Sequence, residues 1–337
     1  MPRRVLFAVG QESSLAFLLP LWKRWSNSTE APDWRVSLES AVRKRPKSDE
    51  IDWRRCLPGS TDTCASLRDA LGEWCPDVVV ASASHALVED SAIAFARTGG
   101  LPFARFIDTW YGYRERLCLR DGRFELPDQI LVIDEPAIAS AQREGIPRQR
   151  LTAVGNPWWE GVQLLAPADP REVVFVSQPV RRFYGGRLGY TEQQAWAALL
   201  ESAHRFPALI QRIHFAPHPA DEMPPPAADD LVNVVPSGRE ALGLAGTVIG
   251  MFSSLLVEAF LAGRRVVSLQ PGAVGPDQNA WGRPDGVVPR VTDPAALPAV
   301  LGGPATDAHD LRAVMKESCA RLDQAIRSMV VMQQYEA

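Results

Sequence analysis

The sequence predicts an α/β protein with two doubly wound domains, each a parallel sheet covered by helices. Short apolar runs rich in valine and isoleucine alternate with longer helical patterns in both halves of the chain. The segment QLLAPADP, residues 163–170, has the composition of a linker and separates the two halves. The chain has 337 residues, of which 46% are hydrophobic, and this is enough for two domains with cores of their own.

The first half, residues 1–162, begins with an apolar strand and continues as alternating strands and helices. Ser, Thr and Asp residues at 60–63 are typical of a helix N-cap, and Gly99–Gly100 is typical of a helix end. Because helices separate the strands, we expect the strands to pair in parallel. The expected strands are 5–9, 34–38, 78–81, 103–107, 129–133 and 151–154, and the expected helices are 14–25, 63–74, 88–97 and 136–144.

The second half, residues 171–305, repeats the same alternation. A loop is expected at Pro224–Pro226, and the last segment, residues 306–337, is predicted to form one or two closing helices. We expect strands at 173–176, 213–216, 232–235, 248–249 and 266–269, and a helix at 191–205 with further helices between the later strands.

The charge and the cysteine content argue against several classes of protein. The net charge is −4 and no long basic run is present, so nucleic-acid binding is not expected. The five cysteines form no close-spaced pair and resemble no zinc ligand set, which favours reduced thiols and a cytoplasmic protein. The segment WKRW, residues 22–25, is expected to belong to an amphipathic surface helix, with peripheral membrane association as the alternative.

Polar residues follow nearly every expected strand. The carboxyl ends of parallel strands lie at one edge of a sheet, and ligands of doubly wound folds bind there. Each such residue alone is more often a helix cap than a ligand contact, but the whole set predicts a small-molecule site in the cleft between two facing domains. Ser177, Gln178, Gly155 and Asn156 are members of this set that we assign to binding a nucleotide.

The most informative stretch is VIGMFSSLLVEAFLAGRRVVSLQP, residues 248–271. An apolar strand ends in a turn that contains Ser253 and Ser254, and a helix follows. Free N–H groups at a helix N-terminus, together with two hydroxyls, suit an anion such as a phosphate. Glu258, one turn deeper, is placed to accept hydrogen bonds from a ribose. His218, which follows the strand 213–216 and precedes a proline, is placed to donate to the same phosphate, with a structural loop histidine as the alternative.

Asp108 and His85 are the candidate catalytic bases of the first half. Asp108 ends a strand and lies in FIDTWYGYRERL, where aromatic neighbours can raise the pKa of a carboxyl group. An N-cap, or an ion pair with a nearby arginine, is the alternative role for Asp108. The candidates for contacts to an acceptor or a sugar are Trp110, Tyr113, Arg114 and Arg181, of which the aromatic residues are equally typical of a core.

Three of these segments together resemble the GT-B superfamily of glycosyltransferases and the related UDP-N-acetylglucosamine 2-epimerases. Residues 128–157 are similar to a strand–helix–strand segment of these families that ends in a GNP turn. FAPHP, residues 215–219, resembles the HP motif of bacterial CMP-sugar glycosyltransferases and polyol-phosphate transferases. FSSLLVEA, residues 252–259, resembles their serine-rich motif with its ribose-binding glutamate. The sequence IDTW, residues 107–110, departs from the sialyltransferase base motif of two acids followed by glycine.

This resemblance implies a GT-B fold, with two facing Rossmann-like domains and C-terminal helices, and a glycosyltransferase that needs neither a metal nor a cofactor. It implies that His218, Ser253 and Ser254 hold the nucleotide phosphate, that Glu258 meets the ribose, and that Asp108 is the base. The implied partners are a CMP- or UDP-linked sugar donor of the hexosyl or sialyl type and a surface-glycan or surface-protein acceptor, as in capsule or lipopolysaccharide synthesis. The alternatives are a nucleotide-sugar 2-epimerase or hydrolase, and a non-catalytic GT-B-like binding protein.

Overall fold

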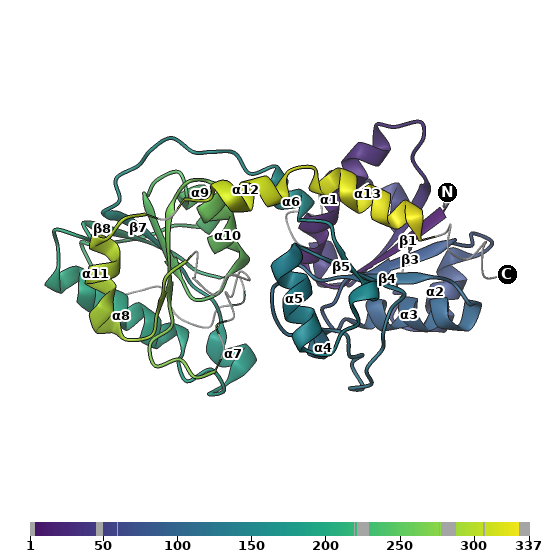
Figure 1. Ribbon diagram of the computed structural model, residues 1–337, viewed down its shortest axis with the longest axis horizontal. Coiled ribbons are helices and arrows are strands. Elements are labelled where there is room, and N and C mark those ends of the chain that lie inside the picture. Colours follow the sequence, from purple (N-terminus) through teal and green to yellow (C-terminus); the bar gives the residue numbers. More distant parts are fainter. Residues whose placement is uncertain are drawn as a thin grey trace. The chain divides into compact units, whose positions relative to one another are not determined.

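The structure is a computed structural model that describes residues 4–44, 50–58, 60–218, 220, 229–275, 277, 288–305 and 307–329. The chain divides into two compact units (Figure 1). Unit 1 consists of Met1–Gly161 and Val314–Ala337, and unit 2 consists of Val162–Ala313. The end of the chain therefore returns to the first unit. The loop expected at Pro224–Pro226 lies outside the described residues.

Unit 1 is built on a six-stranded parallel sheet with the order β2-β1-β3-β4-β5-β6. Every strand that we expected in the first half is present, and each pairs in parallel with its neighbours. The strands are β1 (Arg4–Val9), β2 (Asp33–Leu38), β3 (Val78–Ala81), β4 (Phe103–Phe106), β5 (Gln129–Val132) and β6 (Leu151–Ala153).

Helices cover both faces of this sheet. Figure 1 shows α1 and α13 on one face and α2 and α3 on the other. On the first face Phe7 packs with Trp22 and Trp25 of α1 and with residues of α13, and on the second Leu6 packs with residues of α2 and α3. Trp22 and Trp25 are 3% and 2% exposed, so the membrane role considered for these tryptophans is not supported. The α-helices of unit 1 are α1 (Glu12–Ser26), α2 (Cys64–Leu71), α3 (Leu87–Gly99), α4 (Tyr113–Arg116), α5 (Glu135–Arg143), α6 (Pro157–Glu160) and α13 (Ser318–Ser328), and its 3-10 helices are Val42–Lys44, Trp53–Arg55 and Arg148–Arg150.

Unit 2 has a second six-stranded parallel sheet with the order β12-β11-β10-β7-β8-β9. The five strands expected in the second half are present, and the two-residue strand β12 was not expected. The strands are β7 (Glu172–Val176), β8 (Arg212–Ala216), β9 (Val232–Val234), β10 (Thr247–Gly250), β11 (Arg265–Leu269) and β12 (Arg290–Val291). The helices are α7 (Val180–Tyr184), α8 (Glu192–Arg205), α9 (Gly238–Ala241), α10 (Ser254–Leu261), α11 (Leu297–Gly302), α12 (His309–Met315, which ends in unit 1) and the 3-10 helix Pro294–Ala296.

Local signals in the sequence explain where several helices begin and end. The side chains of Thr63 and Thr191 each accept a hydrogen bond from the third N–H of α2 and α8, and the side chain of that third residue accepts one from the backbone N–H of the cap. Gly100 ends α3 with a left-handed backbone, φ +63°, which glycine adopts without steric strain. These caps fix the helices, and the helices in turn fix the loops at the carboxyl ends of the strands.

Candidate functional site

In unit 2, three predicted residues lie at one edge of the sheet. Strands β8, β7 and β10 are adjacent, and Val176 of β7 is paired with the last residue of each neighbour. His218, Gln178 and Ser253 follow the ends of these strands by two or three residues. The register of the sheet therefore brings together side chains that are up to 75 positions apart in the sequence.

The turn before α10 is organised by side chains. The hydroxyl of Ser253 caps α10 by accepting from the N–H of Leu255 at 3.3 Å, and the side-chain oxygen of Gln178 accepts from the N–H of Phe252 at 2.8 Å. Ser254, the first residue of α10, is exposed. The positive end of the helix dipole thus lies beside an accessible hydroxyl, as a phosphate site requires. Gln178 and Ser253 have structural roles here.

Glu258 is buried one turn into α10, as the sequence suggested, and it has a partner that we did not predict. The guanidinium of Arg239 on α9 donates to both carboxylate oxygens, with Nε 2.8 Å and Nη2 2.7 Å away. The side chain of Glu258 is 9% exposed and that of Arg239 is 44% exposed. Two parallel hydrogen bonds of this kind fix the carboxylate geometrically. The site therefore presents an anchored carboxylate beside a positive charge that is open to solvent.

We predict that Arg239→Ala lowers the free energy of unfolding of unit 2 by about 1.5–3 kcal/mol, because it leaves a buried carboxylate without its charged donors. Urea unfolding measures the loss. The matched control is Arg171→Ala, which removes the exposed pair with Asp169 in the same unit and should cost less than about 1 kcal/mol. Adding Glu258→Gln to Arg239→Ala should restore part of the stability, and a double variant as unstable as the sum of the two single variants would contradict the pairing.

His218 is exposed, and its ring orientation is set by the backbone. Its Nδ1 accepts from the N–H of Ala220 at 3.0 Å, so a neutral imidazole carries its proton on Nε2 and can donate from there. Ser177 is 1% exposed and its N–H donates to the carbonyl of Ala216, and its contact with a nucleotide stays a prediction. Arg181 is exposed on α7.

In unit 1, Asp108 and His85 also follow adjacent strands. Strands β3 and β4 are paired, and the two residues lie in the loops that leave their carboxyl ends. Both side chains are half-buried. His85 has a left-handed backbone with φ +61°, which is unfavourable for a residue with a side chain. The fold thus places the two candidate bases at the same edge of the sheet.

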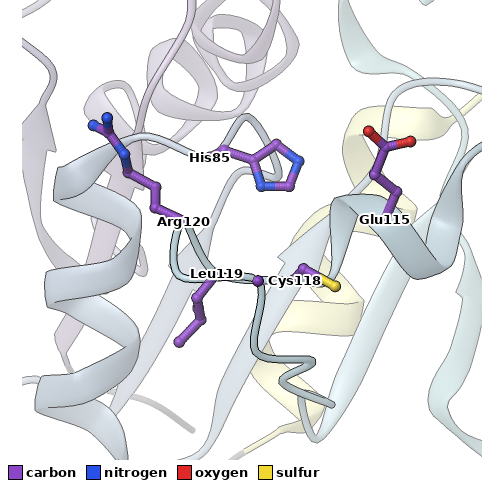
Figure 2. Close-up of a pocket in the computed structure, with 6 residues that line it drawn as sticks. His85, Glu115, Cys118, Leu119 and Arg120 are labelled. Carbon is purple, nitrogen blue, oxygen red and sulfur yellow. The ribbon is translucent and has the colours of Figure 1, made fainter.

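His85 lines a pocket of about 610 Å³, a size typical of small-molecule sites. Figure 2 shows its imidazole directed toward the segment that carries Glu115 and Cys118, whereas Arg120 points away on the other side. The lining combines apolar groups with polar side chains and carries both signs of charge. Such a pocket can bind a hydroxylated molecule and place an imidazole against one of its hydroxyls.

Two predicted acceptor contacts are buried. The indole N–H of Trp110 donates to Asp134 at 3.0 Å, and its ring, 4% exposed, stacks on Trp159 at 5.5 Å. Tyr113 is fully buried and its hydroxyl donates to the carbonyl of Thr109 at 2.9 Å. Burial raises the pKa of Tyr113. Neither ring has an exposed face on which a sugar could stack. Both are core residues, which was the alternative role, and we no longer propose them as contacts to a sugar or an acceptor.

The third predicted contact of this segment, Arg114, is exposed. Its guanidinium lies over the ring of Phe124, 4.8 Å from the centroid, and its backbone N–H donates to Glu144 at 2.8 Å. An exposed cation on an aromatic ring keeps its hydrogen-bond donors available for an anion. Arg114 therefore stays a candidate for contact with an acceptor.

Gly155 and Asn156 have structural roles in unit 1, and they do not belong to the unit that holds His218. Gly155 has φ +77°, and a Cβ placed there would lie 1.9 Å from the hydroxyl of Ser318 and 2.6 Å from Nη2 of Arg321, both on α13. The Asn156 side chain is buried and accepts from the N–H groups at the start of α6. Gly155 thus allows the close approach of α13, and Asn156 caps α6, while the contact of these two residues with a nucleotide stays a prediction.

Two further features concern metal binding and membrane-spanning helices. Across the residues that the structure describes, no group of three or more His, Cys, Asp or Glu side chains is arranged to hold a metal ion. Over the same residues, no helix is both long enough and apolar enough to cross a membrane.

Comparison with known proteins identifies the fold. No protein-family model matches the sequence, and no curated protein matches it. The structure is similar to UDP-GlcNAc 2-epimerase from Neisseria meningitidis bound to UDP-GlcNAc, with a TM-score of 0.68, 12% identity, and 96% of this chain and 100% of that chain covered. It is also similar to the glycotransferase of kitacinnamycin (TM-score 0.62, 16% identity, 98% and 100% covered) and to the spinosyn forosaminyltransferase (0.58, 17%, 98% and 100%). The chain therefore has the GT-B fold.

Proposed function

We propose that this chain is a nucleotide-sugar enzyme that transfers the sugar from its donor to the hydroxyl of an acceptor. The observation that carries the proposal is the edge of the unit 2 sheet. There His218 and Ser254 follow β8 and β10, the two strands that flank β7, and the buried Glu258 carboxylate lies one turn into α10. A nucleotide phosphate is bound by a hydrogen-bond donor and a helix N-terminus, and a ribose is bound by an anchored carboxylate that accepts from its hydroxyls.

In the proposed reaction, Asp108 accepts the proton of an acceptor hydroxyl and the oxygen attacks the anomeric carbon. The bond from that carbon to the phosphate oxygen breaks, and the nucleotide leaves with the electron pair. The Nε2–H of His218 and the positive end of α10 stabilise the charge that develops on the phosphate. His85 is the second candidate for the base, because its imidazole lines the pocket of unit 1.

The proposed donor carries CMP or UDP, and transfer is proposed to proceed without a divalent metal. The proposed acceptor is a surface glycan or a surface protein, and the proposed compartment is the cytoplasm, where nucleotide-sugars are made. These assignments are supported by the sequence motifs at 215–219 and 252–259, which follow β8 and β10, the two strands paired with β7.

A second candidate is a nucleotide-sugar 2-epimerase or hydrolase. It is favoured by the similarity in structure to the Neisseria meningitidis 2-epimerase bound to UDP-GlcNAc. The two activities differ in one requirement: an epimerase or hydrolase converts the nucleotide-sugar with no acceptor present. Incubating the protein with UDP-GlcNAc alone and analysing the sugar by NMR separates them.

The first prediction of the proposed function is that one nucleotide stabilises the protein. In a thermal-shift screen of CMP, CDP, UMP, UDP, GDP and their sugars, we expect one nucleotide at about a hundredfold excess over its Kd to add about 2.7 kcal/mol, or about 5–10 °C for unit 2. We expect the shift to survive EDTA. Stabilisation that EDTA abolishes would overturn the metal-independent part of the proposal.

Two variants assign that stabilisation to the proposed site. His218→Ala and Ser254→Ala should each reduce the shift, whereas His309→Ala, at an exposed histidine in the same unit, should leave it unchanged. No shift with any nucleotide would contradict the proposal and favour a GT-B-like protein that binds a partner without catalysis. A shift that is equal in all three variants would place the nucleotide elsewhere.

A further inference from the structure

The loop that carries His85 is wrapped around a buried carboxylate. Glu89, in the first turn of α3, is fully buried. Its carboxylate accepts from the hydroxyl of Ser82, from the hydroxyl of Ser84 at 2.6 Å, from the N–H of Ser84 at 2.9 Å and from the N–H of Ala86 at 3.3 Å. One acidic group thereby fixes the residues on both sides of His85.

Arg105 of β4 holds the same loop from the other side. It is fully buried, its Nε donates to the carbonyl of Ser82 at 3.2 Å, and its Nη2 lies 3.6 Å from the Glu89 carboxylate. Burial lowers the pKa of Arg105, and the charge of Glu89 opposes that shift. Among the described residues, Nη1 and Nη2 have no hydrogen-bond partner. Glu89 is therefore also the counter-charge of a buried arginine.

Gly10, which follows β1, closes the loop from a third side. A Cβ at this position would lie 2.2 Å from the hydroxyl of Ser84, 2.3 Å from Cβ of Ala86 and 2.7 Å from an oxygen of Glu89. Its N–H donates to the hydroxyl of Ser82 at 3.0 Å. The loop is thus in close contact with β1 as well as α3 and β4, and it has little room to adopt another conformation.

His85 is held in an unfavourable backbone conformation by these contacts. Its φ of +61° costs a residue with a side chain about 1–2 kcal/mol, whereas glycine adopts it freely. Strained residues persist where their surroundings over-determine them, and they cluster at functional sites. A glycine would avoid this cost in free energy, but the residue at this position is a histidine, and its imidazole lines the 610 Å³ pocket.

We infer that Glu89 is a positioning residue that fixes His85 in this conformation and so presents its imidazole to the pocket. Glu89 acts through Ser84 and Ala86, the two neighbours of His85 that it anchors. The proton-transfer role of the imidazole rests on the proposed function. The positioning itself rests on the contacts of the loop.

The first test is an NMR spectrum of the protein labelled with 13C-histidine. The chain has five histidines, and His85→Asn assigns the signal of His85. In Glu89→Gln we expect this signal to broaden and to move toward that of the exposed His309, while the buried His214 of unit 2 is unchanged. A folded Glu89→Gln protein with an unchanged His85 signal would overturn the inference.

A second set of variants covers the case in which Glu89→Gln does not fold. Ser84→Ala keeps the buried ion pair and removes only the 2.6 Å hydroxyl contact, and we expect the same signal to move in the same direction. The matched control is Glu160→Gln, a carboxylate of unit 1 that accepts from the N–H groups of Glu317 and Cys319. An effect on His85 that is as large in Glu160→Gln as in Ser84→Ala would show a general loosening of unit 1 and overturn specific positioning.

Kinetics separate this inference from the proposed function. If transfer is found and His85 is the base, Glu89→Gln should lower kcat about 100-fold and leave the KM of the donor unchanged, because a small displacement of a catalytic group reduces rate more than binding. If Asp108 is the base, Glu89→Gln should retain most of the rate while the His85 signal still moves. If no donor is turned over but the His85 signal moves as expected, the positioning stands and the proposed function fails. Transfer in a Glu89→Gln protein whose His85 signal is unchanged would refute the positioning alone.

Discussion

Replacing Gly155 by alanine is expected to destabilise unit 1 by about 2–4 kcal/mol. Part of the loss is the cost of a side chain at φ +77°, and the rest is the overlap of the new methyl group with Ser318 and Arg321 of α13. Eight of the ten tryptophans lie in unit 1, all except Trp196 and Trp281. Tryptophan fluorescence during urea unfolding therefore follows mainly this unit.

Gly145→Ala is the matched control for Gly155→Ala. Gly145 lies in the same unit with φ +85°, and a Cβ there would have no heavy atom within 4 Å. We expect it to cost only the backbone contribution of about 1–2 kcal/mol. The difference between the two variants measures the packing of α13 against the turn after β6. Equal losses in the two variants would mean that α13 does not pack there.

The positions of the strands, and their alternation with helices along the chain, could be predicted from the sequence because a buried parallel strand is a short run of apolar residues between turn signals. β7 and β10 are such runs, and both were located to within one residue at each end. β12 was missed because a strand of two residues, Arg290–Val291, shows no pattern. The alternation predicted two doubly wound domains. The GT-B fold itself was implied by the resemblance of residues 128–157, 215–219 and 252–259.

The roles of individual residues at the strand ends were harder to predict, because contacts with distant segments decide them. Gly155 is committed to α13, which begins 163 positions later in the chain, at Ser318. Trp110 and Tyr113 could be stacking or core residues by sequence, and only their burial distinguishes the two roles. A helix dipole and an adjacent carboxylate, in contrast, follow from local sequence, which is why Ser253 and Glu258 were found at the start of α10.

Three charged groups that organise the candidate sites were missed. Arg239 and Glu258 are 19 positions apart in the sequence and lie on two different helices, and no pattern in the sequence indicates that they pair. Glu89 did have a signal, since a carboxylate at the third position of a helix that follows serines is typical of a capping box. Its buried partner Arg105 had none, because an arginine within an apolar strand is equally consistent with an edge position.

Asp108→Asn is expected to lower the rate of sugar transfer about 10²–10⁴-fold, because an amide accepts no proton from the acceptor hydroxyl. The stabilisation by the donor nucleotide should stay unchanged, since the proposed nucleotide contacts lie in unit 2. The two are measured by product formation under saturating donor and by thermal shift. Asp69→Asn, at an exposed aspartate on α2, is the matched control and should affect neither.

His85→Asn completes this comparison, because both candidate bases leave adjacent strands. Asparagine tolerates the left-handed backbone of His85, so this variant removes the imidazole with little change in strain. If Asp108 is the base, His85→Asn retains most of the rate that Asp108→Asn loses. If His85→Asn loses the rate and Asp108→Asn retains it, His85 is the base. Glu89, which anchors the loop of His85, would then position the catalytic base. Loss of folding in Asp108→Asn, seen as a lower melting temperature without ligand, would instead mean that Asp108 is a structural residue at the end of β4.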